Sequence, residues 1–158
     1  MERFDDQLIT PEFKRSQRTN IENMVTMLRS IKNTFGENVT RLAWGGYASL
    51  IRQRWRNICE DQKDRNIEAL FGLQWEGSKK LISYEITQKD AKSLTLKVNS
   101  CFWAEEFKRL RATDIGYEYC CIPDFYVAEI FNPAIMYVQG KNMMRGDDCC
   151  IHSYAIGK

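Results

Sequence analysis

The chain has 158 residues, of which 44% are hydrophobic and 28% charged, enough to form one domain with its own core and without disulfide bridges. Its 23 basic and 21 acidic side chains leave a net charge of +2, which argues against nucleic acid or an anionic membrane as a partner. No apolar run approaches the roughly 20 residues that cross a bilayer, and residues 1–6 lack the apolar core of a signal peptide. We therefore expect a cytoplasmic protein whose six cysteines are free thiols.

The N-terminal residues 1–17 are polar, lack apolar periodicity and contain Pro11, so we predict an N-terminal arm or a short irregular helix there.

The following residues, 18–75, have the apolar spacing of helices. The first helix is bounded by Asn20, a suitable N-cap, and by Gly36, a typical C-terminal stop. Gly45 and Gly46 weaken the second, because each glycine costs about 1 kcal/mol in a helix interior. The predicted helices cover residues 20–35, 39–58 and 61–71.

Alternation of apolar and polar residues begins after this helical part and predicts an antiparallel hairpin over residues 79–99. Residues 101–158 are predicted to hold two more helices, the second with Pro123 near its first turn, and a second hairpin. Their predicted bounds are 102–111 and 115–131 for the helices and 135–138 and 151–156 for the strands. Residues 1–158 thus form a single α+β domain, with helices packed on one face of a roughly four-stranded antiparallel sheet made of two hairpins.

Thiols and carboxylates recur through the last third of the chain, at Cys101, Cys121, Asp124, Asp147 and Cys150. Cys101 and Cys121 both lie close to the predicted starts of helices, where the positive end of the helix dipole lowers the pKa of a thiol. Cys121 and Asp124 are about one helical turn apart, so both side chains can face one pocket. This pattern is suited to nucleophilic attack by a thiol with acid–base help from a carboxylate.

Other interpretations of the same residues remain open. Free cysteine is among the most buried residue types and often only fills a core. Cys101, Cys121, Cys150 and His152 could form a tetrahedral zinc site, but there is no C-x-x-C pair, and we predict neither a metal nor another cofactor. Asp147 follows a glycine and has turn chemistry by default.

The order and spacing of these residues resemble the L-2-amino-thiazoline-4-carboxylic acid hydrolase family over residues 101 to about 154. The resemblance rests on the segments CFWAEEF (101–107), DIGYEYCCIPDF (114–125), FNP (131–133) and GDDCC (146–150). The family is associated with bacterial cysteine metabolism, through ring opening of a 2-amino-thiazoline to a carbamoyl-cysteine. The site residues that the resemblance implies are Cys101, Cys121, Asp124, Asp147 and Cys150. It also implies an aromatic residue at position 152, where this chain has His152.

Residues and resemblance together predict a hydrolase that opens a small cyclic amidine-like or imine-like substrate. Cys121 would attack the C=N carbon, while Asp124 or Asp147 moves protons. Arg145 and Lys141 are the candidate cations for a substrate carboxylate, and His152 would shape the pocket.

Three alternatives stay open beside this prediction: direct addition of water, a binding module that senses a small ligand, a metal or redox state, and thiols with a purely structural role. The expected partner is a small-molecule substrate, and the sequence leaves open whether the chain forms a homo-oligomer.

Overall fold

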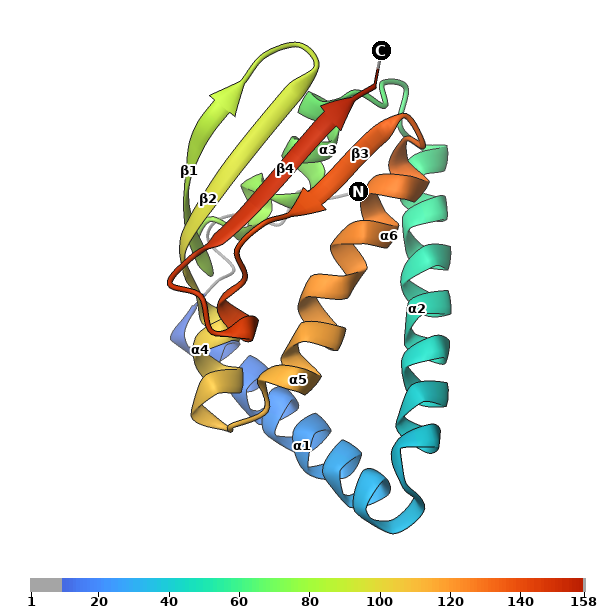
Figure 1. Ribbon diagram of the computed structural model, residues 1–158, viewed down its shortest axis with the longest axis vertical. Helices are drawn as coiled ribbons and strands as arrows, with labels where there is room; N and C mark the ends of the chain where they lie inside the picture. The colour runs from blue at the N-terminus through green and yellow to red at the C-terminus, as the bar shows by residue number, and fades with distance from the viewer. Residues whose placement is uncertain (1–9, 158) are drawn as a thin grey trace.

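The protein combines long helices with one four-stranded antiparallel sheet, as Figure 1 shows for the computed structural model, which describes residues 10–157. The helices are α1 (Pro11–Phe35), α2 (Glu37–Glu60), α3 (Ile67–Gln74), α4 (Phe102–Arg109), α5 (Thr113–Gly116) and α6 (Ile122–Phe131). The strands are β1 (Ile82–Lys89), β2 (Ser93–Cys101), β3 (Ile135–Gln139) and β4 (Cys150–Ile156). Within the described residues, no helix is both long and apolar enough to cross a membrane. The predicted α+β fold with two antiparallel hairpins is confirmed.

The sheet has the strand order β1-β2-β4-β3, so the two hairpins meet along β2 and β4. One face of these central strands is buried, because alternate side chains point into the core. On β4 this face carries Cys150, His152 and Tyr154, and Tyr154 lies beside Tyr137 of β3. The sheet therefore directs several polar side chains toward the helices instead of toward solvent.

Helix α1 begins earlier than predicted, and the prediction of an arm or irregular helix is wrong for residues 11–17. The Thr10 side chain accepts a hydrogen bond from the Phe13 backbone N–H, and Pro11 occupies the first turn, where its missing N–H costs little. Residues 1–9, the rest of the predicted arm, lie outside the described residues. Gly36 ends α1 with a positive φ of 81°, and α1 and α2 diverge from this point as a V (Figure 1).

Helices α2 and α3 also differ from their predicted bounds. Helix α2 continues through Gly45 and Gly46 without a break. Helix α3 begins six residues later than predicted, because the Asn66 side chain caps it by accepting from the Ala69 N–H. It then runs past Gly72 to end at Gln74, and this extra turn brings Gln74 next to the buried face of the sheet.

The predicted helix over residues 115–131 is observed as a continuous helical run that contains a π-helical turn at Tyr117–Cys121. Pro123 therefore lies inside the run and cannot donate to the Tyr119 carbonyl four residues earlier. The Tyr47 hydroxyl of α2 donates to that carbonyl instead, at 3.1 Å, and the two tyrosine rings stack 5.1 Å apart. A π-turn inside an α-helix is often found at functional sites, and this one carries Cys120 and Cys121.

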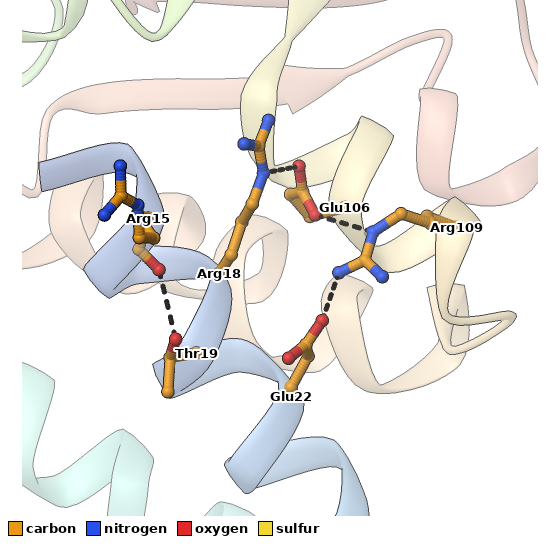
Figure 2. A network of polar contacts seen from close by, with 6 residues as sticks. All are labelled: Arg15, Arg18, Thr19, Glu22, Glu106 and Arg109. Atoms are coloured by element: carbon orange, nitrogen blue, oxygen red, sulfur yellow. Dashed lines mark hydrogen bonds and ion pairs between the residues drawn. The ribbon is translucent and has the colours of Figure 1, made fainter. Parts of the chain in front are cut away.

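Helix α1 is joined to α4 by the ion-pair network of Figure 2, centred on the buried carboxylate of Glu106. Arg18 of α1 contacts one oxygen of Glu106 at 2.6 Å, and Arg109 contacts the other at 2.9 Å. Arg109 also reaches Glu22 of α1 at 2.6 Å. These contacts hold the helix that begins next to Cys101 against the longest helix of the fold.

Candidate active site

Four thiols and one carboxylate come together where the buried face of the sheet meets α4, the π-helical turn and α6. The thiol of Cys121 is close enough to Asp124, Cys150 and Cys101 that each of their charges raises its pKa. Cys120 lies near the same groups, since charges on Cys121, Cys101 and Asp124 raise its pKa. Four of the predicted site residues are thus neighbours, drawn from a strand end, a π-turn, a helix and a strand start.

Asp124 is the most perturbed carboxylate of the group. Burial raises its pKa from 3.8 to about 7, against the opposing effect of hydrogen bonds from Gln74 and Tyr137. Gln74 at the end of α3 donates to Asp124 Oδ1 at 2.7 Å. Its side-chain carbonyl is held in turn by the Tyr154 hydroxyl at 3.3 Å. Asp124 therefore has a fixed orientation and changes protonation state near neutral pH.

A tyrosine and the chain's single histidine complete the polar surroundings of Asp124. The Tyr137 hydroxyl lies 2.6 Å from His152 Nδ1, and Gln139 donates to the same hydroxyl at 3.3 Å. His152 Nδ1 is 3.8 Å from Asp124 Oδ2, but burial lowers the pKa of His152 to about 4, so the ring is neutral at neutral pH. All contacts are satisfied when His152 and Gln139 donate to the Tyr137 oxygen and Tyr137 donates to Asp124.

The thiols themselves are protonated at neutral pH, contrary to the expectation that helix ends lower their pKa. Burial raises the pKa of Cys121 to about 12 and that of Cys101 to about 11. The N–H groups of Ala104 and Trp103 at the start of α4 do act in the predicted direction on Cys101, but burial outweighs them. Any reaction at sulfur therefore needs a neighbouring base.

The loop before β4 closes one side of the thiol cluster. The Met143 N–H donates to Cys150 Sγ at 3.2 Å, and the Asn142 side chain acts on Cys121, whose pKa it lowers against the larger effect of burial. Asp147, predicted as an acid–base residue, accepts a hydrogen bond from the Asn142 backbone N–H at 2.7 Å. Its carboxylate thus has the turn-stabilising contact expected by default for an aspartate after a glycine.

The two predicted substrate-binding cations lie outside this cluster. Lys141 forms an exposed ion pair with Asp148 at 2.9 Å, and the guanidinium of Arg145 lies 4.2 Å from the centre of the Tyr117 ring. Cys149 interacts with Asp148 and Lys141, and its charge raises the pKa of its sequence neighbour Cys150. Among residues 10–157, no group of three or more His, Cys, Asp or Glu side chains is arranged to hold a metal ion.

Several residues of the site carried no recognisable signal in the sequence. Gln74 lies beyond residue 71, the predicted end of the third helix, so its contact with Asp124 depends on the longer α3. Tyr137 lies within a predicted strand, and Asn142 lies in the connection between two predicted strands. Their roles depend on which strands pair, and this information is absent from local spacing.

Two comparisons with known proteins bear on the family of the chain. The family described as L-2-amino-thiazoline-4-carboxylic acid hydrolase matches residues 16–154, nearly the whole chain, including every residue of the cluster. A search of curated proteins finds no match.

Proposed function

The chain belongs to the L-2-amino-thiazoline-4-carboxylic acid hydrolase family, and from this premise we propose that it opens the ring of a small 2-amino-thiazoline-type substrate by hydrolysis at the C=N carbon. The observation that carries the proposal is Asp124, a fixed and largely buried carboxylate with a pKa of about 7 beside Cys121. A general acid–base group is most effective when its pKa is near the working pH.

In the proposed reaction, Asp124 moves the protons. As the Cys121 sulfur bonds to the C=N carbon, its proton passes to Asp124 and the π electrons of the C=N bond move to the ring nitrogen. Asp124 returns the proton to that nitrogen. The exocyclic amino group then gives up a proton through Asp124 and forms a double bond to the attacked carbon, while the ring nitrogen takes that proton and the electrons of its bond to the carbon and leaves as an amine. Water adds across the new C=N bond with Asp124 as base, the adduct collapses to a carbamoyl group, and Cys121 leaves as a thiol after regaining a proton from Asp124, so that one water is consumed overall.

Direct addition of water is the alternative within the same reaction. The raised pKa of Cys121 makes a resting thiolate a minor species, and Asp124 can activate a water in the same position. Both routes need Asp124, whereas only the first needs a sulfur at position 121.

The binding-module alternative is less favoured by the thiols. A redox sensor generally depends on an exposed thiol of low pKa. All six cysteines lie in the described residues, and the pKa of each is raised, first of all by burial.

The proposal is tested by incubating the purified protein with L-2-amino-thiazoline-4-carboxylic acid and following the gain of one water by mass spectrometry. Asp124→Asn should lower turnover by about 100-fold or more, the usual contribution of a positioned acid–base group. Asp114→Asn, an exposed aspartate on α5, is the matched control and should keep full turnover. Turnover that survives Asp124→Asn would contradict the proposal.

The two routes are separated at position 121. Cys121→Ala should abolish turnover if sulfur attacks the substrate, and should retain a large part of it if water attacks directly. Cys149→Ser is the matched thiol control, because the thiols whose charges act on Cys121 are those of Cys150 and Cys101, whereas Cys149 interacts with Asp148 and Lys141.

A further inference from the structure

Asn142, in the loop between β3 and β4, has both its backbone and its side chain fixed. Only 2% of the residue is exposed. Its backbone N–H donates to Asp147 Oδ2 at 2.7 Å, and its Oδ1 accepts from the Met144 N–H at 2.7 Å. The second contact settles the orientation of the amide, because only the oxygen can accept it.

The other end of this amide is a buried donor without a partner. Asn142 Nδ2 has no hydrogen bond to any of the described residues. An unsatisfied buried donor costs about 1–3 kcal/mol, so such a group in a well-packed loop calls for a physical explanation.

The cysteine cluster supplies that explanation. The amide acts on the Cys121 sulfur, which it stabilises in the charged form, although burial has the larger and opposite effect. The next residue in the loop, Met143, donates its backbone N–H to Cys150 Sγ. Two consecutive residues thus act on two neighbouring sulfurs: the Met143 N–H donates to Cys150 Sγ, and the Asn142 side chain lowers the pKa of Cys121.

We propose that Asn142 is a positioning residue whose Nδ2 donates to the Cys121 sulfur when that sulfur becomes charged, and so holds it ready to attack. The inference rests on the proposed function, in which Cys121 is the nucleophile. In the resting thiol Nδ2 makes no hydrogen bond to the described residues, and the bond to sulfur forms as the proton leaves for Asp124, because a charge-assisted hydrogen bond is shorter and stronger than a neutral one.

The test is the alkylation of Cys121 by iodoacetamide over a range of pH, with the modified peptide quantified by mass spectrometry. Asn142→Ser keeps an oxygen that can accept from the Met144 N–H but removes the amide donor. We expect Cys121 to react more slowly at each pH below its pKa, about tenfold for each unit by which its pKa rises. A purely structural role would not move this pH profile in a variant with an unchanged thermal midpoint.

Two further variants keep the test decisive. Asn142→Asp has the shape of asparagine and keeps the acceptor, but its negative charge should slow Cys121 alkylation more than Asn142→Ser does. Asn132→Ser is the matched control, since Asn132 caps the turn before β3 and contacts Arg65 and Ala134 instead of a thiol. Unchanged Cys121 rates in folded Asn142→Ser or Asn142→Asp would overturn the inference.

The outcomes are distinguishable from those of the proposed function. Slower alkylation in Asn142→Ser together with full turnover in Cys121→Ala supports the contact between Asn142 and sulfur and contradicts attack by sulfur. Unchanged alkylation of Cys121 in Asn142→Ser, together with loss of turnover in Asp124→Asn, contradicts the inference and leaves the hydrolase proposal intact.

Discussion

Burial affects Asp124 and its neighbouring thiols in the same direction but with different consequences for catalysis. It raises the pKa of Cys121 to about 12, so the thiol is inert at neutral pH without a base. It raises the pKa of Asp124 to about 7, so the carboxylate is ready both to accept and to donate a proton. The same loss of hydration therefore keeps the Cys121 thiol protonated and brings the pKa of Asp124, the base that can activate it, close to neutral pH.

The raised pKa of Asp124 also predicts how stability depends on pH. The native state favours the protonated carboxyl, so this group contributes stability below about pH 4 that is lost as the pH rises through about 7. Asp124→Asn stays neutral and can still accept from Gln74. Between about pH 4 and pH 8, we expect the thermal midpoint of the variant to rise relative to that of the wild type. The corresponding change in the free energy of unfolding should be a few kcal/mol at most. A difference that is constant over this range would contradict the assigned pKa.

Gly116 shows how closely the supporting side chains pack behind the site. A Cβ at this position would lie 2.6 Å from the Phe107 ring and 2.9 Å from Met144 Cε, both shorter than any real contact. We predict that Gly116→Ala lowers the free energy of unfolding by about 1–3 kcal/mol, the usual cost of overpacking. Gly45→Ala is the control, because its Cβ would meet nothing within 4 Å and should stabilise α2 by up to about 1 kcal/mol. Chemical denaturation of both variants checks the opposite signs.

Local sequence predicts that some side chains of the site lie close together but gives no sign of others that reach it. Helical spacing places Cys121 and Asp124, three residues apart, on one side of a helix, and the two remain neighbours even with a π-turn before Asp124. Local spacing gives no sign that the closest groups to Asp147, Lys141 and Arg145 are a backbone N–H, Asp148 and Tyr117, and their predicted roles in the site stay predictions. Gln74 and Tyr137 contact Asp124 only because of tertiary packing, and no local sequence pattern predicts these two contacts.

At the scale of elements, the sequence predicts which segments are helices and strands better than it predicts their first and last residues. The strands and the long helices follow from apolar spacing, whereas the starts of α1 and α3 depend on single caps, Thr10 and Asn66. Pro123, predicted near a helix start, instead lies within a helical run, where the Tyr47 hydroxyl of α2 replaces the missing hydrogen bond. Such a replacement can be recognised only once the packing of α2 against α6 is known.

The ion-pair network between α1 and α4 gives an element-scale prediction. Burial alone would raise the pKa of Glu106, but Arg18 and Arg109 outweigh it and hold the pKa below its usual value. The network therefore stabilises the fold above the unfolded pKa of about 4.5, and this contribution is lost as the pH falls through the lower folded value.

Glu106→Gln should lower the free energy of unfolding by roughly 1–3 kcal/mol at neutral pH, which is the range for hydrogen bonds to charged groups. The loss is no larger because both arginines are half exposed and remain hydrated in the variant. The loss should shrink in acid, as measured by denaturation at several pH values. Glu22→Gln, whose ion pair with Arg109 is exposed on both sides, should cost less than about 1 kcal/mol. Equal effects of the two variants would contradict the central position of Glu106.

At the scale of the whole molecule, buried core residues are distributed unequally between the central strands of the sheet and helix α2. Strand β2 buries Leu94, Leu96 and Val98 to 2% exposure or less. Helix α2 is 24 residues long but buries only Thr40 and Cys59, and it leaves Leu42 75% exposed. Local opening costs least where few apolar contacts are broken. The middle of α2 should therefore open more easily than the central strands.

Native-state hydrogen exchange read by mass spectrometry checks this distribution. We expect amides of residues 41–50 to exchange faster than those of residues 94–98, because opening α2 exposes little new apolar surface. Equal protection of the two segments in a monomer would contradict the argument. Protection of α2 that rises with protein concentration would instead mean that copies of the chain cover its exposed side chains, since association stabilises the bound form by mass action. The concentration series thus separates a weakly packed helix from one completed by self-association.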